Sequence, residues 1–145
     1  MTTTVSGHHR VDVSADASDV WQAMRHFGDL NWAAGIEAVE VEGDGVGMLR
    51  KVRLAGSDEW ICERLVARDD DRMSFSYVIE GEGMPGFNNY SAHVRAEPSA
   101  SGCGIYWECQ AEADDDPESA QQGLQALAAG IAGLFAAQFE PAGNA

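Results

Sequence analysis

Apolar and polar residues alternate along most of the chain, and clusters of glycine, proline, serine and aspartate separate the alternating runs. A period of two residues is typical of β-strands with one buried face. We expect strands at residues 3–13, 36–42, 48–55, 59–67, 73–80, 87–96 and 104–113. Because the last six follow one another with short turns between them, they should form an antiparallel meander.

A short helix is predicted after the first strand. Residues 14–18 offer capping side chains, and Val20, Trp21 and Met24 then recur at helical spacing. Residues 30–35 predict a second short helical piece, because this segment ends on a glycine that suits a helix C-terminus.

The long helix at the C-terminal end of the chain has the clearest start signal. Asp116 can cap it and Pro117 suits its first position. From there an apolar stripe at helical spacing runs from Leu124 to Gln138. The purely apolar stretch at 126–137 is well short of the ~20 residues that a membrane span needs, so we expect a helix that packs on the sheet rather than a membrane span. Residues 1–145 are expected to form one domain.

Two charges fall on the apolar faces of the predicted strands. Alternation places Arg50 with the apolar residues of one strand and Glu63 with those of the next. A turn centred on Gly56 and Ser57 puts Arg50 opposite Glu63, and a three-residue turn at 69–71 puts Tyr77 opposite Glu63 as well. We therefore predict an inward-facing ion pair in one row with Tyr77.

Inward polar groups need partners or water, and a curved sheet with one helix across it is hard to fill at its wide end. An internal pocket is the simplest arrangement that meets both conditions. The alternative is that Arg50 and Glu63 form a structural pair at the sheet's edge, beside a solid core. Isolated buried ion pairs seldom add net stability, which favours the pocket.

Charge and cysteine content narrow the function classes. Nine Lys and Arg residues stand against twenty-four Asp and Glu residues, which gives a formal net charge of −15. Nucleic acid and anionic lipid surfaces both require basic patches, so neither is an expected partner. The three cysteines lack C-x-x-C spacing, and Cys103 and Cys109 lie too far apart on one predicted strand to bridge each other. Because the first residues lack a basic start and an apolar run, we expect a cytoplasmic protein. No His, Cys or carboxylate spacing matches a metal site, and we expect no metal and no cofactor.

Several short motifs occur together in a fixed order along almost the whole chain. They are Ala17-x-x-Val20-Trp21, Phe27-Gly28-Asp29, Trp32, Gly47-x-x-Arg50, Glu63-x-Leu65, Arg72-x-x-x-x-Tyr77-x-Ile79, Tyr90-x-Ala92 and Trp107 before the long helix. In this order and spacing the chain resembles the START/SRPBCC helix-grip superfamily, and within it the small bacterial polyketide cyclase/dehydrase-like branch. It departs from many relatives after Trp32, where Ala33-Ala34-Gly35 stands in place of a nearby proline.

The resemblance implies an α+β helix-grip fold, in which a seven-stranded antiparallel sheet, two short helices and a long C-terminal helix enclose an apolar cavity. It also implies that the glycine-rich loop at residues 81–86 lies at the cavity mouth and gates it, whereas the loop's composition alone is equally typical of an ordinary hairpin. It does not imply one activity, because this scaffold serves carriers and enzymes alike.

The leading hypothesis is that the cavity binds a small hydrophobic or aromatic molecule, lipid-like or polyketide-like. The residues expected to line it are Met48, Val52, Ile61, Leu65, Phe75, Tyr77, Tyr90, Trp107, Leu127 and Ile131.

Two alternatives stay open. In the first, the protein is a cyclase, dehydratase or lyase for a carbonyl-rich substrate, with Glu63 as base, Arg50 holding an oxyanion and Tyr77 or Tyr90 donating a proton. In the second, the protein is an interaction module or homodimer that uses the outward-facing Trp60. The sequence does not decide between enzyme and carrier.

Overall fold

A computed structural model describes residues 3–33, 35–81, 87–114 and 116–140. In this part of the chain, seven strands form one antiparallel sheet in the order β1-β7-β6-β5-β4-β3-β2. The strands are β1 (Thr3–Val13), β2 (Ile36–Glu42), β3 (Leu49–Leu54), β4 (Trp60–Asp69), β5 (Ser74–Glu80), β6 (Phe87–Ser99) and β7 (Gly102–Ala113). The predicted α+β architecture and its seven strands are confirmed. Loop residues 82–86, expected to gate a cavity, lie outside the described residues.

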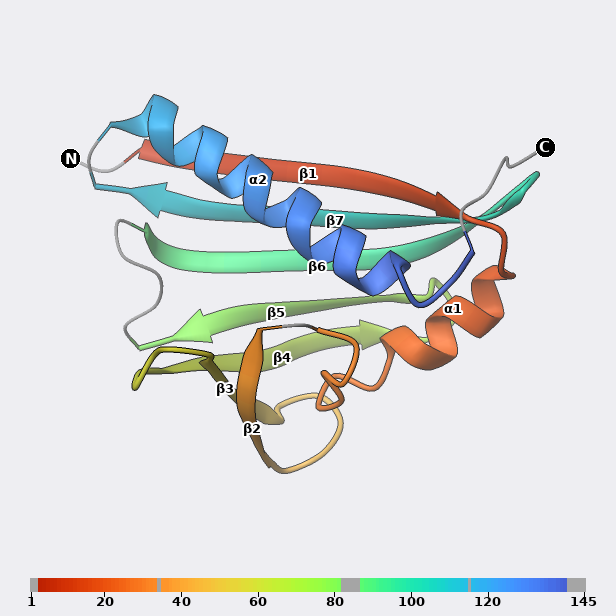
Figure 1. The fold of residues 1–145 in the computed structure, drawn as a ribbon, viewed down its shortest axis with the longest axis horizontal. Coiled ribbons are helices and arrows are strands. Elements are labelled where there is room, and N and C mark those ends of the chain that lie inside the picture. The colour runs from red at the N-terminus through yellow and green to blue at the C-terminus, as the bar shows by residue number, and fades with distance from the viewer. Residues whose placement is uncertain (1–2, 34, 82–86, 115, 141–145) are drawn as a thin grey trace.

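Two helices pack on the sheet. Helix α1 (Ala17–Met24) lies at one end, and helix α2 (Pro117–Ala136) crosses one face in front of β1, β7 and β6 (Figure 1). Asp116 caps α2 as predicted, because its side chain accepts a hydrogen bond from the backbone N–H of Ser119 (3.3 Å). Leu124 and Phe135 of the predicted stripe are buried against the sheet, so the core lies between α2 and the strands.

The second short helix expected at residues 30–35 is wrong, since the described residues there form turns. Asp29 forms local hydrogen bonds with backbone groups that would otherwise take part in helical hydrogen bonds. Its carboxylate accepts from the backbone N–H of Asn31 (3.1 Å), and its carbonyl accepts from the indole of Trp32 (3.0 Å). The segment becomes a turn that directs Trp32 towards α2.

Helix α2 approaches β1 so closely that only glycine fits at one position. A Cβ on Gly7 would lie 2.5 Å from the carbonyl oxygen of Leu124, which is backbone and cannot move aside. Beside this contact the helix supplies acceptors to the strand: Gln121 accepts from the N–H of Ser6 (2.8 Å) and Gln125 from that of His8 (3.0 Å). The free edge of β1 is thereby bonded to the helix.

The register between β3 and β4 is the predicted one. Arg50 pairs with Glu63 and Val52 with Ile61. All four side chains are on the face of the sheet that α2 covers, where they line one cavity.

The register between β4 and β5 differs from the prediction, and Tyr77 lies opposite Leu65 rather than Glu63. The turn spans residues 70–73 instead of 69–71, and a β-bulge between Leu65 and Ala67 shifts the pairing again. Because the net displacement is two residues, Tyr77 keeps the inward face that alternation assigned to it. Arg50, Glu63 and Tyr77 therefore share a face without forming one row.

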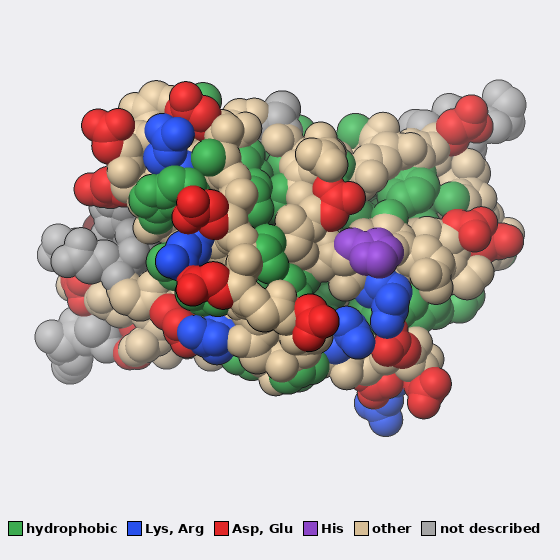
Figure 2. Space-filling model, turned by 90° about the horizontal axis from the view of Figure 1, so that it is seen from below, with side chains coloured by type: hydrophobic (Ala, Val, Ile, Leu, Met, Phe, Trp, Pro, Cys, Tyr) green, Lys and Arg blue, Asp and Glu red, His purple; other side chains and the backbone are tan. Residues whose placement is uncertain are grey.

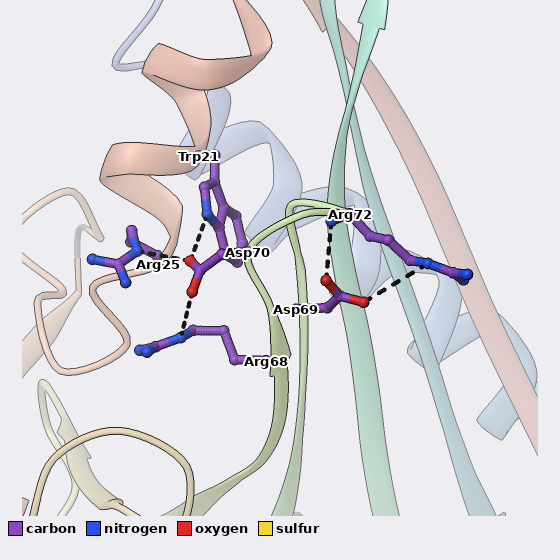
Figure 3. Close-up of polar contacts among 6 residues, drawn as sticks. All are labelled: Trp21, Arg25, Arg68, Asp69, Asp70 and Arg72. Carbon is purple, nitrogen blue, oxygen red and sulfur yellow. Dashed lines mark hydrogen bonds and ion pairs between the residues drawn. The ribbon is translucent and has the colours of Figure 1, made fainter.

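The turn between β4 and β5 is tied to helix α1 through Asp70 (Figure 3). Its Oδ1 accepts from Arg25 Nε and from the indole Nε1 of the buried Trp21, both at 3.0 Å, and its Oδ2 lies 3.6 Å from Arg68 Nε. The hydrogen bond from Arg25, and then that from Trp21, hold the pKa of the Asp70 carboxyl below its ordinary value of 3.8. The ionised carboxylate is the form that joins the two elements.

We expect Asp70→Asn to lower the melting temperature at neutral pH and to have less effect as the pH falls. Because the pKa of Asp70 is lower in the folded state than in the unfolded state, its ionised carboxylate stabilises the fold at pH values above the unfolded-state pKa. This stabilisation is lost as the pH falls through the folded-state pKa. The difference in melting temperature between wild type and variant should therefore become smaller below pH 3.8. Thermal melts over a pH series measure it. Asp69→Asn is the matched control, because the partner of Asp69, Arg72, is 85% exposed. A gap that stays constant through acid pH would contradict the prediction.

Candidate functional site

A cavity of ≈ 240 Å³ lies between the sheet and helix α2. Its walls come from β2, β3, β4, β5, β6, β7, α2 and the turn before β2. The lining residues are Leu30, Trp32, Ala33, Ile36, Arg50, Val52, Leu54, Ile61, Glu63, Tyr77, Ile79, Tyr90, Trp107, Leu127, Ile131 and Leu134. Leu54 and Leu134 are 45% and 39% exposed, so they mark the side on which the cavity meets solvent.

Most residues proposed from the sequence as ligand contacts meet at this cavity. These are Val52, Ile61, Tyr77, Tyr90, Trp107, Leu127 and Ile131, together with the two charged residues Arg50 and Glu63. The structure does not place Met48, Leu65 or Phe75 on its wall.

Phe75 packs instead on the α1 side of the core, with its ring 6.4 Å from that of Trp21, and Leu65 is fully buried. Met48 precedes β3 and lies beside Gly28. These three side chains occupy the filled end of the core.

Arg50 and Glu63 form an ion pair inside the cavity wall, with side chains only 8% and 13% exposed. Arg50 Nε lies 2.8 Å and Nη2 2.7 Å from the same oxygen, Glu63 Oε1. The remaining guanidinium nitrogen, Nη1, donates to the carbonyl oxygen of Phe27 at 2.7 Å. Every nitrogen of Arg50 thus has a protein acceptor.

Aromatic rings surround this guanidinium. Its Cζ lies 3.8 Å from the ring centroid of Phe27 and 5.3 Å from that of Tyr77, a geometry in which the electron-rich faces stabilise the positive charge. The ring of Tyr90 follows at 6.2 Å from that of Tyr77. The cavity floor is therefore a cation held against aromatic surfaces and neutralised by one carboxylate.

The two tyrosines are neutral hydroxyl groups at physiological pH. Burial raises the pKa of Tyr77, and the negative charge of Glu63 raises it further, while Arg50 acts in the opposite direction. Burial is also the main cause that raises the pKa of Tyr90. Both phenols can therefore donate a hydrogen bond inside the cavity.

Trp107 adds a donor without a partner. It lies on β7, is only 4% exposed, and its indole Nε1 makes no hydrogen bond within the described part of the chain. The Trp107 indole lies close enough to the Tyr77 hydroxyl to lower the pKa of Tyr77. The indole N–H and the hydroxyl oxygen nevertheless do not have hydrogen-bond geometry. A buried N–H without an acceptor costs free energy, so an acceptor supplied from within the cavity would be favourable.

Sequence patterns missed part of the wall. Ile79 and Leu54 are on the same strand faces as predicted cavity residues, and Leu134 belongs to the predicted apolar stripe of the helix. The sequence pattern therefore contained enough information to predict these three as lining residues. Leu30, Trp32 and Ala33 come from the segment that was predicted as a helix, and no periodicity could place them, whereas Ile36 is the first residue of strand β2, which was predicted.

A second hollow, of ≈ 530 Å³, lies on the sheet face opposite α2. Several of its polar groups are already paired. His93 Nδ1 and Ser76 Oγ are 2.8 Å apart, and Arg95 is bonded to Glu108. On the face seen in Figure 2, basic side chains likewise stand beside acidic ones rather than in a patch of their own. The inner cavity is therefore the stronger candidate site.

Within residues 3–33, 35–81, 87–114 and 116–140, no three His, Cys, Asp or Glu side chains are arranged so that they could hold a metal ion. Neither described helix has the length and apolar content that a bilayer span requires.

The sequence matches a family model over residues 4–140, almost its whole length. The family is described as polyketide cyclase/dehydrase and lipid transport. No curated protein matches the chain.

Solved structures show the same fold at low sequence identity. Norcoclaurine synthase from Thalictrum flavum superposes with a TM-score of 0.78 at 20% identity, covering 94% of this chain and 87% of that one. Ara h 8.0201 gives a TM-score of 0.75 at 17% identity, with 94% and 97% covered. A protein from Nitrosospira multiformis gives 0.76 at 21% identity, with 92% and 95% covered.

Proposed function

The chain belongs to the polyketide cyclase/dehydrase and lipid transport family, and from this premise we propose that it binds a small hydrophobic or aromatic molecule in the cavity between the sheet and α2. The observation that carries the proposal is the wall itself, which is mostly aliphatic and aromatic with a few convergent polar groups. Such walls give affinity through apolar burial and orientation through hydrogen bonds. The Thalictrum flavum enzyme, which shares the fold, has been solved with dopamine and hydroxybenzaldehyde bound.

Binding is better supported than catalysis. A general base needs an oxygen that is free to take a proton, yet Glu63 is paired with Arg50 through Oε1, which leaves only Oε2 for that role. The second candidate, acid–base chemistry on a carbonyl-rich substrate with Glu63, Arg50 and Tyr77, is kept because these groups face one cavity. Conversion of a bound compound by wild type but not by Glu63→Gln would favour the catalytic role.

We expect apolar compounds that fit the cavity to raise the melting temperature, because a ligand that binds only the folded state stabilises it in proportion to its occupancy. Thermal melts against fatty acids, flavonoids and simple phenols measure the effect. Leu127→Arg places a charge on the cavity wall and should abolish the shift, whereas Trp60→Ala, on the opposite face of β4, should leave it intact. If no compound changed the melting temperature of the wild type, the result would contradict the proposal.

A further inference from the structure

We propose that the ligand is a neutral, oxygen-bearing aromatic molecule of one ring or a compact bicycle, which accepts a hydrogen bond from Trp107 and donates one to Glu63. This inference rests on the proposed function, because it names the class of molecule that the same cavity takes. It excludes long acyl chains and multi-ring compounds, and it excludes carboxylates of any size.

The size limit follows from the volume. The cavity holds ≈ 240 Å³, below the range of roughly 300–1,000 Å³ that is usual for sites of drug-sized ligands. A benzene ring occupies a protein cavity of about 150 Å³. One ring with polar substituents, or two fused rings, therefore fills the space. The aromatic walls formed by Trp32, Tyr77, Tyr90 and Trp107 suit a planar molecule.

The acceptor on the ligand is indicated by Trp107. Its indole N–H is buried in the cavity wall and has no acceptor among the described residues. The neighbouring Tyr77 hydroxyl oxygen could accept a hydrogen bond, but it does not have hydrogen-bond geometry with this indole. A ligand carbonyl or ether oxygen would satisfy the indole, and a hydrocarbon would leave it unpaired.

The donor on the ligand is indicated by Glu63. Both contacts from Arg50 to Glu63 are made to Oε1, and Oε2 receives no hydrogen bond within the described part of the chain. An ionised carboxylate only accepts hydrogen bonds, so Oε2 is available to a ligand donor such as a hydroxyl group. A molecule with a hydroxyl at one position and a carbonyl at another meets both requirements.

The exclusion of carboxylates follows from the charges on the wall. Arg50 is the only cation among the described lining residues, and its three nitrogens are occupied by Glu63 and by the carbonyl of Phe27. An anionic ligand would find no free positive charge and would lie near the carboxylate of Glu63. Buried like charges repel each other strongly, so the cavity selects against acids.

Isothermal titration calorimetry with matched compounds tests the inference. Para-hydroxyacetophenone offers both groups, para-ethylphenol lacks the carbonyl, para-methoxyacetophenone lacks the donor, and para-hydroxybenzoate carries a charge. We expect the first to bind the wild type about tenfold or more tightly than each of the other three. Equal affinities, or a preference for the benzoate, would overturn the inference while leaving the proposed cavity function in place. Failure of all four, when a fatty acid or flavonoid still binds, would also overturn only the inference.

Trp107→Phe keeps an aromatic wall and removes the N–H. We expect it to weaken para-hydroxyacetophenone by about tenfold and to leave para-ethylphenol nearly unchanged, which a general loss of packing would not do. Circular dichroism confirms that the variant is folded. Equal weakening of both compounds would contradict the role of Trp107. If no apolar compound of any size bound the wild type, the proposed function itself would fail.

Discussion

Arg50→Met is expected to lower the free energy of unfolding by about 3–5 kcal/mol, which is the cost of leaving one partner of a buried ion pair uncompensated. Glu63 would keep its charge in a wall where it is only 13% exposed, with no other cation lining the cavity in the described part of the chain. The carbonyl of Phe27 would also lose the donor that now lies 2.7 Å away. Urea denaturation of both proteins measures the difference.

The double variant Arg50→Met, Glu63→Leu distinguishes the contribution of the ion pair to stability from that of side-chain packing. Because it replaces both charges by apolar groups of similar size, we expect it to recover most of the lost stability. A residual loss of about 1 kcal/mol is expected, since the carbonyl of Phe27 stays without its donor. If the double variant were as unstable as Arg50→Met, the guanidinium would be stabilising the fold by packing on Phe27 and Tyr77 rather than by neutralising Glu63.

Phe135→Ala is expected to cost about 3–5 kcal/mol, the usual penalty for removing a large buried ring. Phe135 is 2% exposed, and its ring centroid lies 5.3 Å from that of Trp32, 6.5 Å from that of Trp107 and 5.7 Å from that of Phe139. The ring therefore joins helix α2 to the turn before β2 and to the cavity wall. Chemical denaturation measures the stability, and calorimetry should also show weaker ligand binding, because Trp107 loses its support.

The neighbouring residue supplies the matched control. Leu134 is on the same helical turn but is 39% exposed, so Leu134→Ala should change the unfolding free energy by no more than about 1 kcal/mol. Similar losses for the two variants would mean that helix propensity rather than core packing sets the cost.

Strand positions could be predicted from the sequence because alternation and turn residues act locally. The pairing of Arg50 with Glu63 followed from one short turn and is confirmed. The pairing of Tyr77 was displaced by two residues, because the pattern marks neither of two features. The turn starts one residue later and is one residue longer than expected, and a bulge between Leu65 and Ala67 reverses part of that shift. The described residues between 30 and 35 form turns, because Asp29 offers a local alternative to helical hydrogen bonds.

The candidate site was only partly predictable for a related reason. Alternation tells which face a side chain is on but not how far along the strand the core is filled. Val52 and Phe75 both point inward, yet Val52 lines the cavity and Phe75 packs beside α1. The unpaired indole of Trp107 depends on what surrounds it in three dimensions, so no sequence pattern could show it.

The two outer strands of the sheet resist unwanted strand addition in different ways. An exposed strand edge is a template for intermolecular pairing and aggregation. On β1, Gln121 and Gln125 occupy the N–H groups of Ser6 and His8, so an incoming chain would have to displace the helix. On β2, with the sequence IEAVEVE, the protection is electrostatic. Three of its seven residues are glutamates, and two of these, Glu37 and Glu42, are paired with Arg53 and Lys51 of β3, so a second copy of the strand would meet a row of charged side chains. Raising the ionic strength should weaken the second barrier and not the first, so any salt-induced self-association should begin at β2.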